Sequence, residues 1–299
     1  MISTVHAAVF AHNEARTLVR SVRRLLDSTG NDVRLRVHLL VNGCRDATPE
    51  VARGLAAECP DRVWVADLPV ADKAAAWNTY VYDLAGRADA FVFQDGDCWP
   101  VGDAVRRMLD RLAHDPTLHA VGAAYDVGFN RRRLTALQRD RRWLYGNLYA
   151  VRGAHLDRLR AVGFRTPVGI VAEDSLVTHA CKACFPDYRK FDDARIGLDP
   201  SIRFAFHPLR PWRPGDVRAH VQRMVRRRLM MEQLVRIGWR EIDRVPPTLG
   251  AIHGDLRLKL LERKPWIGPL DRAVLAKISN PKSAAPAASA APPASARAA

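Results

Sequence analysis

The sequence predicts an α/β protein with a mixed, mostly parallel sheet, helices on both sheet faces, and a C-terminal helical extension. Three observations support this fold class. Short apolar runs alternate with amphipathic stretches through roughly the first hundred residues. Polar and acidic motifs directly follow several of the apolar runs. With 299 residues, the chain is long enough for one large domain and a smaller addition.

The first part of the chain is expected to alternate between strands and helices. Each strand candidate is rich in β-branched or aromatic residues, and each helix candidate repeats apolar residues at three or four positions. Thr48-Pro49-Glu50 marks a helix start, because proline is favoured in the first helical turn. Strands are expected at residues 5–10, 35–41, 63–68 and 91–94. Helices are expected at residues 15–27, from 48 onward, and at 73–84.

The alternation is less regular beyond residue 100. Further strands are expected at residues 120–129, 148–151 and 202–206, and helices at 101–113, 173–180, 216–236 and 251–263. The character of the chain changes after Pro208, where long arginine-rich helices begin. We therefore expect a main domain at residues 1–207, a helical extension at 208–279, and a disordered Ala/Pro-rich tail at 280–299.

The composition limits the cellular context and the partners. The net charge is +15, which reflects either a bias towards arginine and alanine or an anionic partner such as a nucleotide, a lipid phosphate, a membrane surface or nucleic acid. The five cysteines are scattered, which favours reduced thiols. No apolar run approaches the ~20 residues of a membrane-spanning helix, and no signal peptide is recognisable. We expect a cytoplasmic protein.

Asp95-Gly96-Asp97 is the most informative motif, because it follows the expected strand at residues 91–94. Strand side chains alternate with period two, so the two carboxylates should point the same way. Such a pair suits a hard divalent cation, with phosphate oxygens as further ligands. A solvated turn is the alternative for this short motif.

Five motifs in order resemble family 2 glycosyltransferases, which bind nucleotide-diphosphate sugars in a GT-A (Rossmann-like) fold. The agreement extends over residues 3–235. Asn42 stands where the family usually has an acidic residue, and Cys44 where it usually has serine. The motifs are Ala11-His12-Asn13-Glu14, Asn42-Gly43-Cys44-Arg45-Asp46-Ala47-Thr48, Asp72-Lys73-Ala74-Ala75-Ala76-Trp77-Asn78, Asp95-Gly96-Asp97 and Glu173-Asp174.

The resemblance implies an inverting, metal-dependent glycosyltransferase that takes a sugar from a nucleotide-diphosphate donor, with UDP as the expected nucleotide. The main domain would then be catalytic, with nucleotide-sugar and acceptor halves. The implied donor-binding residues are Ala11, Asn13, Glu14, Asn42, Asp46, Lys73, Asp95, Arg223 and Arg226.

The resemblance also implies the metal and catalytic residues. Asp97 would bind Mg²⁺ or Mn²⁺ directly, Asp95 would contact the ribose or the metal, and His207 could complete the metal site. Asp174 would act as general base and Glu173 would orient the acceptor side. The structural alternatives are an acidic helix start for Glu173-Asp174 and a structural role for His207.

The C-terminal motif and the arginine-rich segments indicate how many sugars are added and what kind of acceptor is used. Gln222-Arg223-Met224-Val225-Arg226-Arg227 only loosely resembles the Gln-x-x-Arg-Trp motif of processive enzymes, so a single addition is expected. The segments 131–142 and 216–236 would suit an anionic membrane surface and a lipid-linked or glycan acceptor, or else present arginines to water.

Two other functions stay open. A nucleotidyltransferase would need a Gly-rich phosphate loop after the first strand, where His12-Asn13-Glu14 stands. A non-enzymatic anion- or nucleic-acid-binding protein would explain the charge, but nucleic acid is disfavoured because no recognisable binding module is present. A catalytically inactive relative that only binds is a further alternative.

Overall fold

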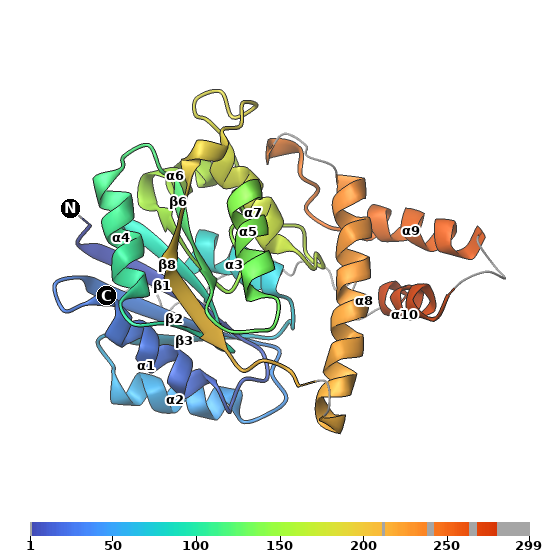
Figure 1. The fold of residues 1–299 in the computed structure, drawn as a ribbon, viewed down its shortest axis with the longest axis horizontal. Helices are drawn as coiled ribbons and strands as arrows, with labels where there is room; N and C mark the ends of the chain where they lie inside the picture. The colour runs from blue at the N-terminus through green and yellow to red at the C-terminus, as the bar shows by residue number, and fades with distance from the viewer. Residues whose placement is uncertain (1, 211–212, 238–241, 263–267, 280–299) are drawn as a thin grey trace.

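The computed structural model describes residues 2–210, 213–237, 242–262 and 268–279. Its centre is one eight-stranded sheet with the strand order β3-β2-β1-β4-β7-β6-β8-β5 (Figure 1). The strands are β1 (Thr4–Ala11), β2 (Arg34–Asn42), β3 (Val63–Leu68), β4 (Ala90–Asp95), β5 (Cys98–Pro100), β6 (Ala120–Tyr125), β7 (Leu148–Arg152) and β8 (Ile196–Phe206).

The sheet is mixed, as predicted. Strands β1, β2, β3 and β4 pair in parallel, and so do β6 and β8. Strand β7 is antiparallel to both β4 and β6, and β5 is antiparallel to β8. The antiparallel strand β7 therefore joins the two parallel groups.

Helices cover both faces of the sheet, which confirms the predicted α/β architecture (Figure 1). The helices of the main domain are α1 (Leu18–Thr29), α2 (Thr48–Glu58), α3 (Lys73–Thr79), α4 (Ala104–His114), α5 (Arg131–Arg141), α6 (Gly153–Ala161) and α7 (Glu173–Lys182). A π-helical turn at Tyr80–Leu84 follows α3, and a 3₁₀ turn at Asp193–Arg195 precedes β8.

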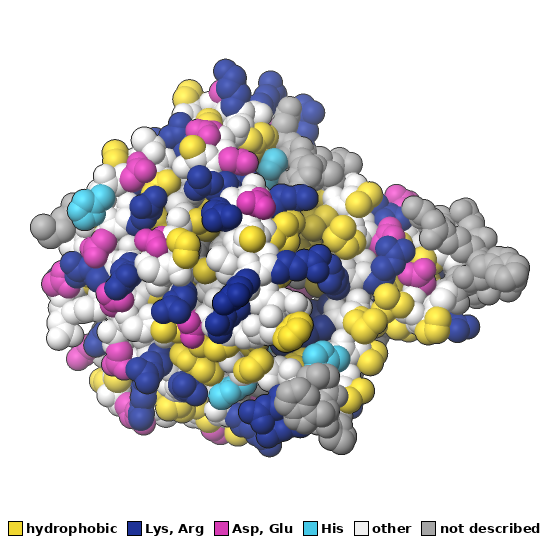
Figure 2. All heavy atoms as spheres, in the orientation of Figure 1, with side chains coloured by type: hydrophobic (Ala, Val, Ile, Leu, Met, Phe, Trp, Pro, Cys, Tyr) yellow, Lys and Arg dark blue, Asp and Glu magenta, His cyan; other side chains and the backbone are white. Residues whose placement is uncertain are grey.

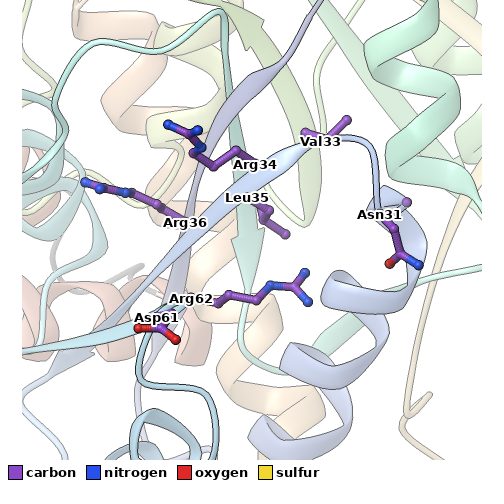
Figure 3. Close-up of a pocket in the computed structure, with 8 residues that line it drawn as sticks. Asn31, Val33, Arg34, Leu35, Arg36, Asp61 and Arg62 are labelled. Atoms are coloured by element: carbon purple, nitrogen blue, oxygen red, sulfur yellow. The ribbon is translucent and has the colours of Figure 1, made fainter.

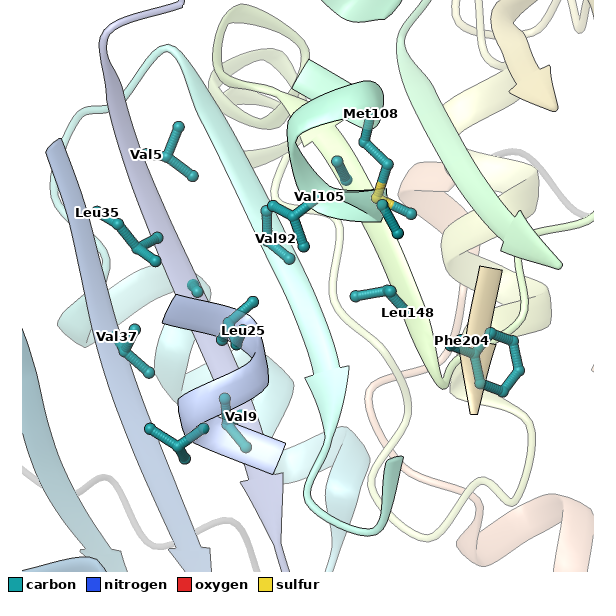
Figure 4. Packing of buried hydrophobic residues seen from close by; sticks show 14 of the residues in the cluster. Val5, Val9, Leu25, Leu35, Val37, Val92, Val105, Met108, Leu148 and Phe204 are labelled. Atoms are coloured by element: carbon teal, nitrogen blue, oxygen red, sulfur yellow. The ribbon is translucent and has the colours of Figure 1, made fainter. Parts of the chain in front are cut away.

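Two apolar clusters lie on the two faces of the sheet because strand side chains alternate. In β1, Val5, Ala7 and Val9 pack on the side of α1, α2 and α4, where Leu25 and Met108 also lie (Figure 4). Ala8 and Phe10 belong to the other cluster, towards α3, α6 and α7. Burial on both faces explains why β1 and β4 are nearly continuous apolar runs.

The C-terminal helices pack partly on one another and partly on the sheet, where Ile237 and Leu249 join its second apolar cluster. Helix α8 (Pro214–Ile237), a 3₁₀ turn (Ile242–Arg244), α9 (Gly250–Glu262) and α10 (Pro269–Ile278) follow one another. Leu229 of α8 packs with Leu256, Leu260 and Val274, and Arg228 pairs with Asp271 at 3.0 Å. Within the described ranges, no helix is long and apolar enough to cross a lipid bilayer. The expected tail at 280–299 lies outside the described residues.

Several elements differ from the sequence prediction. Strand β6 ends at Tyr125 rather than near residue 129, because the chain bends after Tyr125 and Gly128 adopts φ +105°. Strand β8 begins earlier than expected, at Ile196. Strand β5 and helices α5, α6 and α10 are not among the predicted elements.

Candidate active site

The carboxyl ends of β1, β2 and β4 lie at one edge of the sheet. The parallel register pairs Phe10 with Asp95 and Ala11 with Val41. Ala11, Asn42 and Asp95 are the last residues of their strands, so the three predicted motifs that follow begin side by side. Parallel strands place their loops in this way, and ligands bind there in open α/β sheets.

The loops after β1 and β2, residues 12–14 and 43–47, are hydrogen-bonded to each other; we call them the paired loops. Asn13 adopts φ 59°, and its Oδ1 accepts the N–H of Arg45 at 2.8 Å. Its own N–H donates to Cys44 Sγ at 3.3 Å. The N–H of Glu14 donates to Thr48 Oγ1 at 2.7 Å. These contacts fix the backbone of both loops before any ligand binds.

Asp46 and Asn42 also hold the paired loops. Asp46 accepts the N–H groups of Thr48 at 3.0 Å and Ala15 at 3.3 Å. Burial acts to raise the pKa of Asp46, but the hydrogen bond from the Thr48 hydroxyl and these two backbone hydrogen bonds lower it. Asn42 is only 3% exposed, and its amide nitrogen can donate to Ala11 O at 2.6 Å. Both side chains are therefore engaged in shaping the loops, beside Ala11, Asn13 and Glu14.

Lys73 bridges two of the predicted acidic residues. It is the first residue of α3, whose N-cap Asp72 accepts the N–H of Ala75 at 2.7 Å. Lys73 Nζ lies 2.5 Å from Asp95 Oδ1 and 2.6 Å from Glu173 Oε1. Burial acts to lower the pKa of Lys73, but the two carboxylates outweigh it and raise that pKa. The structure thus brings residues of three separate motifs together.

Asp174 lies next to this bridge. It follows Glu173 in the first turn of α7, and its Oδ2 accepts the N–H of Gly146 at 3.0 Å. Its Oδ1 accepts the N–H of Ser175 at 2.8 Å. Burial raises the pKa of Asp174 to about 6, with Glu173 acting in the same direction and Lys73 against it. A carboxylate with such a pKa can accept a proton near neutral pH.

Gly146 and Asn147, which the sequence analysis did not single out, connect these groups. Gly146 O accepts a hydrogen bond from Lys73 Nζ at 3.2 Å, while its N–H binds Asp174. Asn147 donates to Asp95 Oδ2 at 3.3 Å and accepts the N–H of Asp95 at 3.0 Å. A Gly-Asn pair directly before an apolar run was the available signal. Asp95, Asp97, Glu173 and Asp174 are called the acidic cluster below.

Asp97 and His207 flank the same end of the β5–β8 ladder. Cys98 pairs with Phe206 in this antiparallel ladder; Asp97 directly precedes Cys98, and His207 directly follows Phe206. The His207 ring is exposed and contacts the Trp99 ring at a centroid distance of 4.9 Å. Among the described residues, no hydrogen bond or ion pair engages the Asp97 carboxylate.

The carboxylates at this edge suit a divalent cation. Burial raises the pKa of Glu14 to about 7, and Asp97 and Asp95 contribute in the same direction. Burial also raises the pKa of Asp95 to about 7, despite Lys73. Over the described ranges, no three His, Cys, Asp or Glu side chains surround one point as a complete metal site would. Asp95 and Asp97 are the carboxylates that could hold a cation, whose other ligands would then come from a bound phosphate group.

The two predicted arginines of α8 face different surroundings. The charge of Arg223 opposes the burial that raises the pKa of Tyr125, and Asp174 also acts on that tyrosine. The charge of Arg226 instead adds to the burial that lowers the pKa of Lys277 in α10. Among the described residues, no hydrogen bond or ion pair joins either arginine to the acidic cluster.

A surface pocket at the opposite end of β2 is separate from this site. Arg34, Leu35 and Arg36 line it together with Asp61 and Arg62, near the start of β2 and β3 (Figure 3). None of the predicted site residues lines this pocket.

Comparisons with known proteins identify the family and the fold of the chain. The family model "Glycosyl transferase family 2" matches residues 7–167, more than half of the 299 residues. One similar solved structure is the mannosyltransferase PcManGT from Pyrobaculum calidifontis, in complex with GDP-Man and Mn²⁺. It is 22% identical with a TM-score of 0.59, and the match covers 94% of this chain and 77% of that chain, which shows a shared GT-A fold. No curated protein matches. The chain is a glycosyltransferase and belongs to family 2.

Proposed function

We propose that the chain transfers one sugar from a nucleotide-diphosphate donor to an acceptor hydroxyl, with inversion at the anomeric carbon. The carrying observation is that Asp174, a carboxylate with a raised pKa, lies in one cluster with the donor-side residues Lys73 and Asp95. A single displacement needs such a base on the side opposite the leaving group. That PcManGT is in complex with GDP-Man and Mn²⁺ supports a nucleotide-sugar donor and a divalent cation.

The reaction needs a base for the acceptor hydroxyl and positive charge for the leaving diphosphate. Asp174 accepts the proton of the acceptor hydroxyl, whose oxygen forms the new bond to the anomeric carbon. The bond from that carbon to the diphosphate breaks, and the diphosphate leaves with the electron pair. Glu173 holds Lys73 in position, and Lys73 and Arg223 provide positive charge towards the diphosphate.

We propose that Asp95 and Asp97 hold Mg²⁺ or Mn²⁺, with His207 as a further candidate ligand. When bound, the cation neutralises charge on the leaving diphosphate. The paired loops, through Ala11, Asn13 and Glu14, would contact the nucleoside, with Asn42 and Asp46 shaping them. Arg226 stays a prediction for the donor diphosphate or for an acceptor phosphate.

Calorimetry with UDP and with GDP, each with and without Mn²⁺, tests this function. We expect cation-dependent binding of one nucleoside diphosphate, lost in Asp97→Asn. Asp103→Asn is the matched control, because Asp103 is an exposed partner of Arg107 on α4. Nucleoside triphosphate turnover with pyrophosphate release would support a nucleotidyltransferase instead. Salt-sensitive DNA binding without nucleotide affinity would contradict both enzymes.

A further inference from the structure

Helix α8 exposes an apolar stripe. Its members are three or four residues apart, with Arg228 filling the one gap, so they share one helix face. We call Val217, Val221, Met224, Met231 and Val235 the α8 stripe; their exposed fractions are 48%, 54%, 58%, 51% and 74%. Large apolar side chains exposed in a continuous row mark an interaction surface more often than isolated ones do.

The opposite face of α8 is the one that packs on the rest of the protein. Leu229, Gln233 and Ile237 follow each other at intervals of four and are at most 2% exposed. Gln233 Oε1 accepts the N–H of Val171 at 2.9 Å, and its Nε2 donates to Gly169 O at 3.1 Å. These contacts fix the rotation of the helix, so the stripe is turned away from the sheet.

Basic side chains border the α8 stripe. Arg218 and Arg227 are exposed, and within the described residues no acidic partner pairs with either of them. The nearby acid Glu232 already pairs with Arg228 and Arg236. Figure 2 shows hydrophobic and basic side chains intermixed over the region that α8 crosses. The stripe therefore combines exposed apolar area with uncompensated positive charge.

A second segment has the same chemistry. Phe129 is fully exposed, and Arg131, Arg132 and Arg133 shortly after it are exposed too.

We propose that the α8 stripe docks on an anionic membrane surface, with the helix axis in the plane of the interface. Apolar side chains then enter the headgroup boundary, and the bordering arginines contact lipid phosphates. A second copy of the chain fits this surface less well, because two stripes face to face would bring Arg218 and Arg227 of both copies together. The inference is independent of the proposed reaction.

Vesicle co-sedimentation of the full chain tests the proposal. The probes are vesicles of phosphatidylcholine alone and of phosphatidylcholine mixed with phosphatidylglycerol, at low and high ionic strength. We expect binding only to the mixed vesicles. The triple variant Val221→Ser, Met224→Ser, Met231→Ser should lower the partition coefficient at least about tenfold, because burial of even one such side chain corresponds to about that factor. Arg218→Gln with Arg227→Gln should weaken binding and reduce its salt dependence.

Val70→Ser is the matched control, because Val70 is an exposed valine, at 38%, in the loop after β3. It should bind vesicles as the unmodified chain does. Circular dichroism and nucleotide binding check that each variant is folded. Absence of binding to mixed vesicles at low ionic strength would overturn the proposal, and so would unchanged binding of the triple variant. Self-association that the triple variant abolishes in light scattering would identify a dimer interface instead. Failure of nucleotide binding alone concerns only the proposed function.

Discussion

The paired loops and the acidic cluster lie at the same edge of the sheet but differ in how their polar groups are satisfied. In the paired loops, side chains bond to nearby backbone groups, and hydrogen bonds lower the pKa of Asp46. In the acidic cluster, one lysine pairs with two of the four carboxylates, those of Asp95 and Glu173, and burial raises the pKa values of Asp95 and Asp174. The loops are complete without a ligand, whereas the cluster has an excess of negative charge that a ligand can relieve.

Removing the carboxylate charge of Asp174 should have the largest effect. Asp174→Asn retains an oxygen to accept the Gly146 N–H but cannot take a proton, so we expect kcat to fall about 10²- to 10⁴-fold. Nucleotide affinity should change little. Steady-state kinetics and calorimetry measure the two quantities. Asp140→Asn, on the exposed surface of α5, is the matched control. A kcat within a factor of about three of the unmodified chain would exclude Asp174 as the base.

The dependence of kcat on pH should report the ionisation of Asp174. Asp174 must be ionised to accept a proton, and burial raises its pKa to about 6, with Glu173 adding to this and Lys73 opposing it. The rate should therefore fall roughly tenfold per pH unit below about pH 6, whereas an ordinary aspartate would stay ionised to about pH 4. The measurement is kcat against pH. A rate that is flat down to about pH 5 would contradict this environment.

Lys73→Met should destabilise the fold, because it leaves Asp95 and Glu173 without their counter-charge. Both side chains are mostly buried, with 24% and 8% exposed. Breaking such a pair on one side costs at least about 2 kcal/mol of unfolding free energy. Urea denaturation measures it, with Lys190→Met as control because Lys190 is 78% exposed. Equal unfolding free energies of the two variants would show that Asp95 and Glu173 do not need the charge of Lys73 for stability.

Gly146→Ala should have an intermediate effect on both activity and stability. A Cβ there would lie 3.0 Å from Lys73 Nζ and 3.2 Å from Asp174 Cβ, so one of these groups must move. We expect a kcat decrease of about tenfold. Gly54→Ala in α2 is the control, because nothing lies within 4 Å of that Cβ position. The control should gain up to about 1 kcal/mol in unfolding free energy. A similar gain for Gly146→Ala would contradict the close contacts of position 146 with Lys73 and Asp174.

Asp46→Ala should have the smallest effect. The variant loses hydrogen bonds to Thr48 and Ala15 at the start of α2, which corresponds to about 1 kcal/mol of unfolding free energy. Asp61→Ala, before β3, should change stability less. Thermal unfolding compares them. A loss as large as that of Lys73→Met would mean that the two regions are equally constrained.

Much of the sheet could be predicted from local patterns. The strand at residues 63–68 matches β3, and the expected strands at 5–10, 35–41 and 91–94 each fall within β1, β2 and β4. These strands are apolar because both faces of the sheet are buried, and an apolar run can be recognised from the sequence alone. The family resemblance, rather than a strand end, grouped Asp95 with Glu173 and Asp174. The last two residues begin α7, which follows helix α6 rather than a strand, and Glu173 reaches Asp95 through Lys73.

Other features depend on contacts between distant residues. Strand β5 has only three residues and exists because it pairs with Phe204–Phe206, about a hundred residues later. The rotation of α8 could not be read from its sequence, since apolar residues occur on more than one of its faces. Val225 and Leu229 pack inward while Val217 and Val221 are exposed. Gly146 and Asn147 acquire their roles only through folding.

The reversed direction of β7 explains how Gly146 and Asn147 reach the candidate site. Because β7 runs antiparallel to β4, its first residue, Leu148, lies opposite Gln94 near the end of β4. Residues just before an antiparallel strand are thus delivered to the edge where parallel strands finish. In a mixed sheet of this kind, the search for ligand-contacting positions should include segments that precede a reversed strand.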